Sequence, residues 1–114
     1  MNDSRLIWKV RSIKPYPDAH NHLLIGQVVG RDQVCLELMC MSFHYGRAVN
    51  GPKDIAVGAI GKRIVPWSRI EIINELPASF DYQNARLKAD QKGRVFFSDG
   101  HYSCSIVTIR NKHY

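Results

Sequence analysis

Apolar and polar residues alternate with a period of two along much of the first two thirds of the chain. Between Leu23 and Leu76 the alternating stretches are short, and glycine and proline separate them. A period of two places every second side chain on one face of a strand, and glycine and proline mark the turns between strands. The pattern therefore predicts a mainly β protein whose residues 23–76 form a small curved sheet, with strands at 6–13, 23–29, 33–43, 55–65 and 69–74.

The strand expected at residues 33–43 differs from the others because its second half is apolar on both faces. The inward face is predicted to carry Val34, Leu36, Leu38 and Cys40, and the opposite face ends in Met39, Met41 and Phe43. A strand of this kind is typically covered on both sides. The cover is expected to be the chain's own N- or C-terminal segment, or a neighbouring subunit.

Beyond Leu76 the composition changes, and two further elements are expected. A short α-helix is predicted over residues 79–93, capped by Ser79 or Asp81 and ended by Gly93. A β-hairpin is predicted over residues 94–110 around an Asp99-Gly100 turn, which pairs Phe97 with Tyr102 and Val95 with Cys104.

Length and composition indicate one globular domain, residues 1–114. Apolar residues make up 45% of the 114 residues. No apolar run approaches the roughly 20 residues of a membrane-spanning helix, so a cytoplasmic protein without membrane contact is expected. The three cysteines, Cys35, Cys40 and Cys104, lie in apolar runs and are interpreted as packing residues, with a disulfide or a catalytic thiol as the alternatives.

No catalytic, metal or cofactor motif stands out, so the sequence predicts a protein that is not an enzyme and holds no cofactor or metal. His20 and His22 are two residues apart and share a face if the segment is extended. A metal site needs three or four ligands, and an exposed polar loop is the simpler interpretation of this pair.

The net charge is more informative about function than the motifs are. Sixteen Lys and Arg residues against ten Asp and Glu residues give a net charge of +6, which favours polyanionic partners. A basic surface that serves only solubility is the alternative. Basic and aromatic residues alternate in two loops, where cations can neutralise phosphates and aromatic faces can stack on bases. The candidate nucleic-acid-binding residues are Arg31, Tyr45, Arg47, Lys53, Lys62, Arg63, Trp67 and Arg69.

The run from Ile25 to Leu38 resembles the paired strands of the first motif of Sm-like proteins. The run from Gly61 to Ile70 resembles the short strand, tight corner and final strand of the same SH3-like small β-barrels. Cys35 stands where the family has its base-stacking asparagine. The resemblance spans residues 23–76 and implies a small barrel, oligomerisation and contact with RNA.

Two functions follow from these observations. The first is a non-catalytic binding module for a polyanion, single-stranded RNA or DNA. The alternative is a self-associating structural or adaptor protein that docks a protein partner through the face of Met39, Met41 and Phe43.

Overall fold

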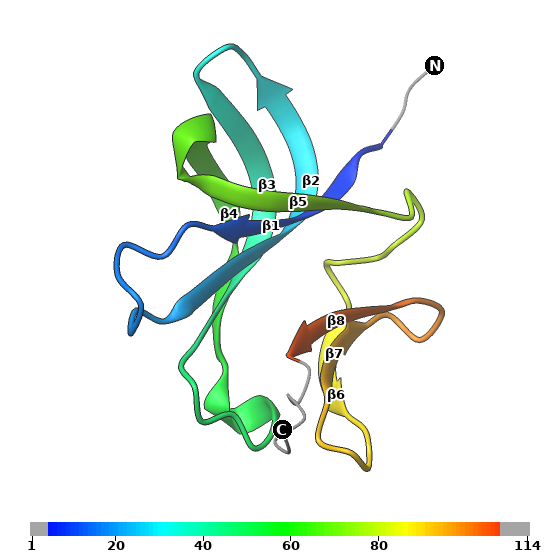
Figure 1. Cartoon of the computed structure of the whole chain (residues 1–114). Coiled ribbons are helices and arrows are strands. Elements are labelled where there is room, and N and C mark those ends of the chain that lie inside the picture. The colour runs from blue at the N-terminus through cyan, green and yellow to red at the C-terminus, as the bar shows by residue number, and fades with distance from the viewer. Residues whose placement is uncertain (1–4, 108–114) are drawn as a thin grey trace.

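Two antiparallel sheets make up the computed structural model, which describes residues 5–107 (Figure 1). The first sheet has the strand order β4-β3-β2-β1-β5, and the second has the order β6-β7-β8. The strands of the first sheet are β1 (Ile7–Ser12), β2 (Asn21–Arg31), β3 (Cys35–Tyr45), β4 (Ala56–Pro66) and β5 (Ile70–Leu76). Those of the second are β6 (Arg86–Ala89), β7 (Val95–Ser98) and β8 (Ser103–Val107), and two 3-10 turns complete the fold, η1 (Pro52–Asp54) and η2 (Trp67–Arg69).

All five strands predicted from the alternating pattern are present in the first sheet. The predicted closed barrel is not shown, because β4 and β5 are the two edge strands and are joined through η2 without pairing in residues 5–107. The sheet is nevertheless curled. Every one of its five strands contributes to a single cluster on its concave face, formed by Val10, Leu24, Leu36, Leu38, Cys40 and Val65 with Trp8, Val28, Trp67, Ile70 and Ile73 at its margin.

The other face of the first sheet packs against the second sheet. Phe43 of β3 meets Phe97 of β7 edge to face, with ring centroids 4.9 Å apart, and Phe97 also contacts Phe80 at 5.7 Å. Met41 is partly buried against the same cluster. The face of Met39, Met41 and Phe43 is therefore covered, at Phe43 and Met41, by the chain's own C-terminal part.

On the concave face of β3, Leu36, Leu38 and Cys40 are fully buried, as predicted. Val34 was expected to point inward with them, but it is 67% exposed. The reason is local: the Asp32 carboxylate accepts hydrogen bonds from the backbone N–H groups of Val34 and Cys35, both at 2.7 Å. This turn delays the start of β3 to Cys35.

The helix predicted over residues 79–93 is wrong. Turns occupy the first part of the segment, and β6 follows at Arg86–Ala89, where Leu87 pairs with Phe97 of β7. Leu87 is partly buried while Arg86 and Lys88 on either side are exposed. This is the alternation of an edge strand, and pairing with β7 prevails over the thin helical stripe on which the prediction rested.

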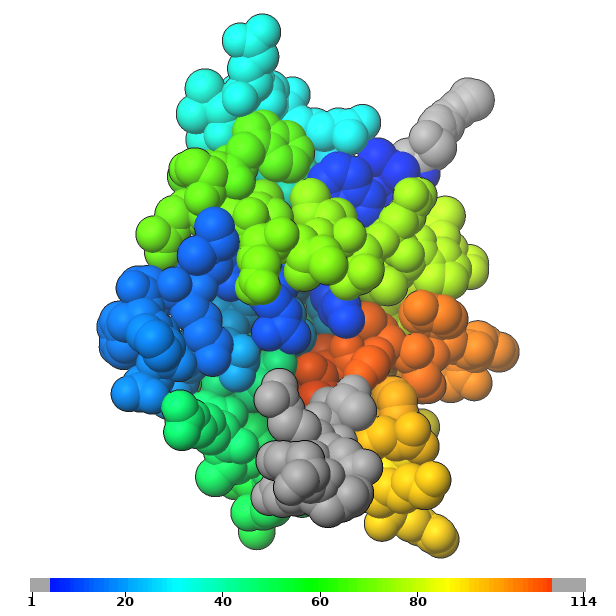
Figure 2. Space-filling model, in the orientation of Figure 1, coloured from blue at the N-terminus to red at the C-terminus, as the bar shows by residue number. Residues whose placement is uncertain are grey.

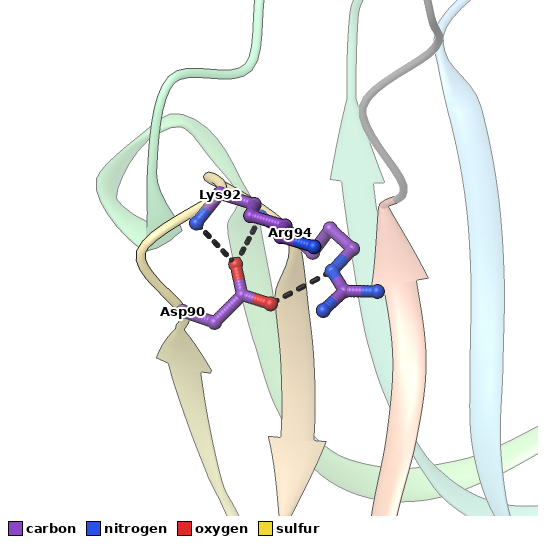
Figure 3. Close-up of polar contacts among 3 residues, drawn as sticks. All are labelled: Asp90, Lys92 and Arg94. Atoms are coloured by element: carbon purple, nitrogen blue, oxygen red, sulfur yellow. Dashed lines mark hydrogen bonds and ion pairs between the residues drawn. The ribbon is translucent and has the colours of Figure 1, made fainter.

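The β6–β7 turn is held by one carboxylate (Figure 3). Asp90 Oδ1 accepts hydrogen bonds from the backbone N–H groups of Lys92 at 2.9 Å and Arg94 at 3.0 Å, and Oδ2 accepts one from Arg94 Nε at 2.7 Å. These hydrogen bonds hold the pKa of Asp90 below its ordinary value against the opposing effect of desolvation. The guanidinium of Arg94 is thereby paired with a carboxylate of its own turn.

The hairpin is present, but its predicted register is wrong. Phe97 pairs with Cys104 and Ser98 with Ser103, so the loop has four residues instead of two. The Asp99 carboxylate accepts hydrogen bonds from the N–H groups of His101 and Tyr102, both at 2.8 Å, which stabilises the wider turn. Residues 108–110 of the predicted hairpin lie outside the described residues.

All three cysteines are free thiols, with Cys40 and Cys104 buried and Cys35 partly exposed. No helix within residues 5–107 is long and apolar enough to cross a membrane.

Candidate anion-binding pocket

A cavity of about 350 Å³ lies at one end of the concave face of the first sheet. Its walls come from the end of β1, the β1–β2 connection, β2, β4 and η2. Figure 2 shows the connection, in blue, packed beside the green segment that contains η2 and β5. The backbone N–H of Ile13 donates to the carbonyl of Arg69 at 2.8 Å, which fastens this side of the pocket.

Strand alternation explains how polar groups reach this cavity. His22 precedes Leu24 by two residues in β2, so both side chains lie on the concave face, and Arg63 stands in the same relation to Val65 in β4. Leu24 and Val65 give the cavity apolar lining, and His22 and Arg63 give it polar lining.

The polar lining is basic. Two arginines and two histidines line the cavity, and no aspartate or glutamate from residues 5–107 is among the lining residues. The basic residues are His20, His22, Arg63 and Arg69. Neither arginine belongs to the ion pairs found within the described part of the chain. Their charges are therefore not neutralised by a carboxylate.

His22 is the most constrained of these groups. Its Nδ1 lies 3.4 Å from Ser12 Oγ, and its ring stacks on that of His44 with centroids 4.1 Å apart and planes 14° from parallel. Its Nε2 is buried and has no hydrogen-bond partner among residues 5–107. A buried polar atom without a partner typically costs about 1–3 kcal/mol, so this nitrogen calls for an explanation.

Both stacked histidines are biased toward the neutral form. Burial, then the charges of His44 and Arg63, lower the pKa of His22 below 6.5. Burial also lowers the pKa of His44, with Arg63 and His20 acting in the same direction. The fixed positive charge at neutral pH therefore comes from the arginines.

Arg63 is the residue that connects these groups. Its Nη2 donates one long hydrogen bond of 3.4 Å to Ser42 Oγ, and its charge acts on both stacked histidines. The side chain is exposed. Arg63 can therefore turn its guanidinium toward a ligand at little cost in hydrogen bonding.

Of the eight residues predicted to bind nucleic acid, the structure brings Arg63 and Arg69 together in the pocket. It places the other cations elsewhere and, for three of them, with partners. Lys62 pairs with Glu37 at 3.0 Å, Arg47 pairs with Asp18 at 3.1 Å, and the Arg31 guanidinium lies 5.5 Å from the Trp8 ring centroid. Lys53 lies in η1.

The two predicted stacking residues are engaged in the fold. Tyr45 is only 6% exposed, and its hydroxyl donates to the carbonyl of Ile106 at 3.1 Å. Trp67 Nε1 donates to the carbonyl of Asp32 at 2.7 Å, and the ring packs at the margin of the concave cluster. Neither ring lines the cavity.

Sequence reasoning missed the roles of Ser12, His22 and His44. His20 is exposed in the β1–β2 connection, as expected, but His22 belongs to β2 and pairs across the sheet with His44. The available signal was the position of His22, which continues the inward series of Leu24. No group of three or more His, Cys, Asp or Glu side chains within residues 5–107 is arranged to hold a metal ion.

Comparisons with protein-family models, with curated proteins and with solved structures found no match to this chain.

Proposed function

We propose that this protein is a non-catalytic binding module for a polyanion, single-stranded RNA or DNA, and that its pocket receives a phosphate. The observation that carries the proposal is one cavity lined by two arginines and two histidines, with no carboxylate from the described residues. Guanidinium groups match phosphate oxygens in geometry and stay charged at all physiological pH values. The net charge of +6 attracts such ligands over a longer range.

The rest of the lining supports a ligand larger than a phosphate ion. Ile13, Pro15, Ile64 and Pro66 also line the cavity, and Ile13 and Ile64 are 42% and 62% exposed. These apolar groups offer contact to a sugar or a base beside the charged groups. The volume, about 350 Å³, falls within the range of roughly 300–1,000 Å³ that is usual for small-ligand sites.

Tyr16 is the residue we propose for base stacking in place of Trp67 and Tyr45. It is 62% exposed and directly follows Pro15, which lines the cavity. Stacking on an aromatic side chain contributes about 1–3 kcal/mol per base and tolerates any sequence. Tyr16→Ala is expected to weaken binding without altering its dependence on salt.

The alternative function, self-association or docking of a protein partner, has less surface available than the sequence suggested. Phe43 is fully buried beneath Phe97, so a partner reaches that part of the Met39, Met41 and Phe43 face only by displacing the second sheet. The pocket needs no such rearrangement, and for this reason we favour nucleic-acid binding.

Fluorescence anisotropy with labelled single-stranded RNA and DNA, at low and at physiological salt, tests the proposal. The pocket variant Arg63→Glu, Arg69→Glu is compared with Arg86→Glu, Lys88→Glu, which makes the same change in net charge at exposed positions of β6. We expect the pocket variant to lose at least ten times more affinity than the β6 variant. Equal losses in the two variants would show that net charge, and not the pocket, drives binding.

A further inference from the structure

We infer that the pocket binds the terminal phosphate monoester of a nucleic-acid strand in preference to the phosphodiesters inside the strand. This inference rests on the proposed function and narrows its ligand. It joins three observations: the convergence of Arg63 and Arg69 on one cavity, a wall closed by a backbone hydrogen bond, and the unpartnered Nε2 of His22.

The distribution of cations does not suit a strand that passes across the surface. Proteins that hold internal phosphodiesters line a continuous groove with positive charges. Here Lys62 and Arg47 each pair with a carboxylate at the surface, and Arg31 lies over an aromatic ring, away from the cavity. The charges that remain convergent are those of Arg63 and Arg69, in a single cavity.

The pocket wall also favours a chain end. The hydrogen bond from Ile13 N–H to the Arg69 carbonyl joins the β1–β2 connection to η2 on one side, and β4 forms another wall. A continuous strand needs two open sides in order to enter and leave. A terminal group needs only one.

The charge and the number of free oxygens separate the two ligands most sharply. A terminal phosphate has three free oxygens, a charge of about −1.5 to −2 at pH 7 and a second pKa of about 6. An internal phosphodiester has two free oxygens, a single charge and no proton near neutral pH. A terminal phosphate in its singly protonated form can therefore donate a hydrogen bond to Nε2, and in its doubly charged form it can accept a hydrogen bond from Nε2–H.

A monoester can therefore form a hydrogen bond with Nε2 in either tautomer of His22. Both tautomers are compatible with the contact between Nδ1 and Ser12 Oγ. A phosphodiester can also accept a hydrogen bond from Nε2–H, but it brings less negative charge and one free oxygen fewer to Arg63 and Arg69. Since Nε2 is buried in the free protein, contact with a ligand requires a neighbouring group to move.

The test compares three oligonucleotides of one sequence, with a 5′-phosphate, with a 3′-phosphate, or with hydroxyl groups at both ends, by anisotropy at physiological salt. We expect one phosphorylated strand to bind at least tenfold more tightly than the unphosphorylated strand. Arg63→Gln, at an exposed position, should reduce this preference to less than twofold, whereas the matched control Lys88→Gln should preserve it.

Competition identifies the source of the phosphate. A nucleoside monophosphate that displaces the strand as well as a phosphorylated oligonucleotide would support the monoester and identify a free nucleotide as a sufficient ligand. A cyclic nucleotide, which is a diester, should compete at least tenfold more weakly. Equal affinity for all three strands, with binding still lost in Arg63→Glu, Arg69→Glu, would overturn this inference and leave the proposed function standing. No binding of any strand would overturn both.

Discussion

Replacing Gly26 by alanine tests whether the first sheet is as tightly curled as the structure shows. Gly26 in β2 pairs with Cys40 in β3, on the concave face that continues into the pocket. A Cβ at this position would meet the carbonyl oxygen of Met39 at 2.1 Å and the Cα of Cys40 at 2.5 Å. Both are backbone atoms, so the clash cannot be relieved by a change of rotamer, and the two strands must move apart.

The expected cost follows from two opposing effects. Overpacking typically costs about 1–3 kcal/mol, and a clash with backbone belongs at the upper end of that range. Alanine is favoured over glycine inside a strand by about 0.5–1 kcal/mol. We therefore expect Gly26→Ala to lower the free energy of unfolding by about 2 kcal/mol, which corresponds to a fall in Tm of about 8 °C for a domain of this size.

Gly61 supplies a matched control, because it pairs with the same Cys40 from the opposite side, in β4. A Cβ at Gly61 meets nothing within 4 Å. Gly61→Ala should leave the free energy of unfolding unchanged or raise it by up to about 1 kcal/mol, since alanine reduces the conformational entropy of the unfolded chain. Urea denaturation followed by tryptophan fluorescence and circular dichroism gives both values. Equal stability of the two variants would refute the tight approach of β2 to β3 at this pair.

Three further results are expected. Burial and nearby positive charge hold the pKa values of His22 and His44 below 6.5, so at acidic pH the unfolded chain binds more protons than the folded chain. The urea midpoint of unfolding should therefore be lower at pH 5.5 than at pH 7.5, and a higher midpoint at pH 5.5 would contradict this. Tyr45→Phe removes the hydrogen bond to the buried carbonyl of Ile106 and should lower the free energy of unfolding by about 1–2 kcal/mol. Urea denaturation measures this change, and an unchanged free energy of unfolding would show that the hydrogen bond contributes nothing. Burial raises the pKa of Cys40 to about 11, so this thiol should resist alkylation at pH 8 in the native protein and react in urea. Mass spectrometry detects the modification, and rapid alkylation of Cys40 in the native protein would refute its burial.

The strands of the first sheet could be predicted because each carries its own pattern. Leu36, Leu38 and Cys40 alternate with more polar residues, and glycine or proline marks the ends of the neighbouring strands. Such information is local, and the burial of these three side chains follows from it directly.

The second sheet was harder to predict because its elements depend on contacts between distant residues. Arg86–Ala89 has a weak pattern and becomes a strand only because the edge of β7 offers it a partner. The hairpin register depends on one carboxylate, Asp99, which stabilises a four-residue loop where the Asp-Gly pair suggested two. Turn statistics alone do not distinguish these two lengths.

The pocket was not predictable for a related reason, and that reason also bears on its function. Three neighbouring strands carry a polar residue on the concave face toward one end of the sheet, Ser12, His22 and Ser42, and the side chain of Arg63 reaches Ser42 from β4. Each of these residues alone looks like an ordinary polar strand residue, and only side-chain contacts between the strands bring them together. A sheet selected for stability alone would keep this face apolar, since a buried Nε2 without a partner is destabilising. Local departures of this kind, three of which (Ser12, His22 and Arg63) line one cavity, are expected where a fold carries a binding site, as we propose for this chain.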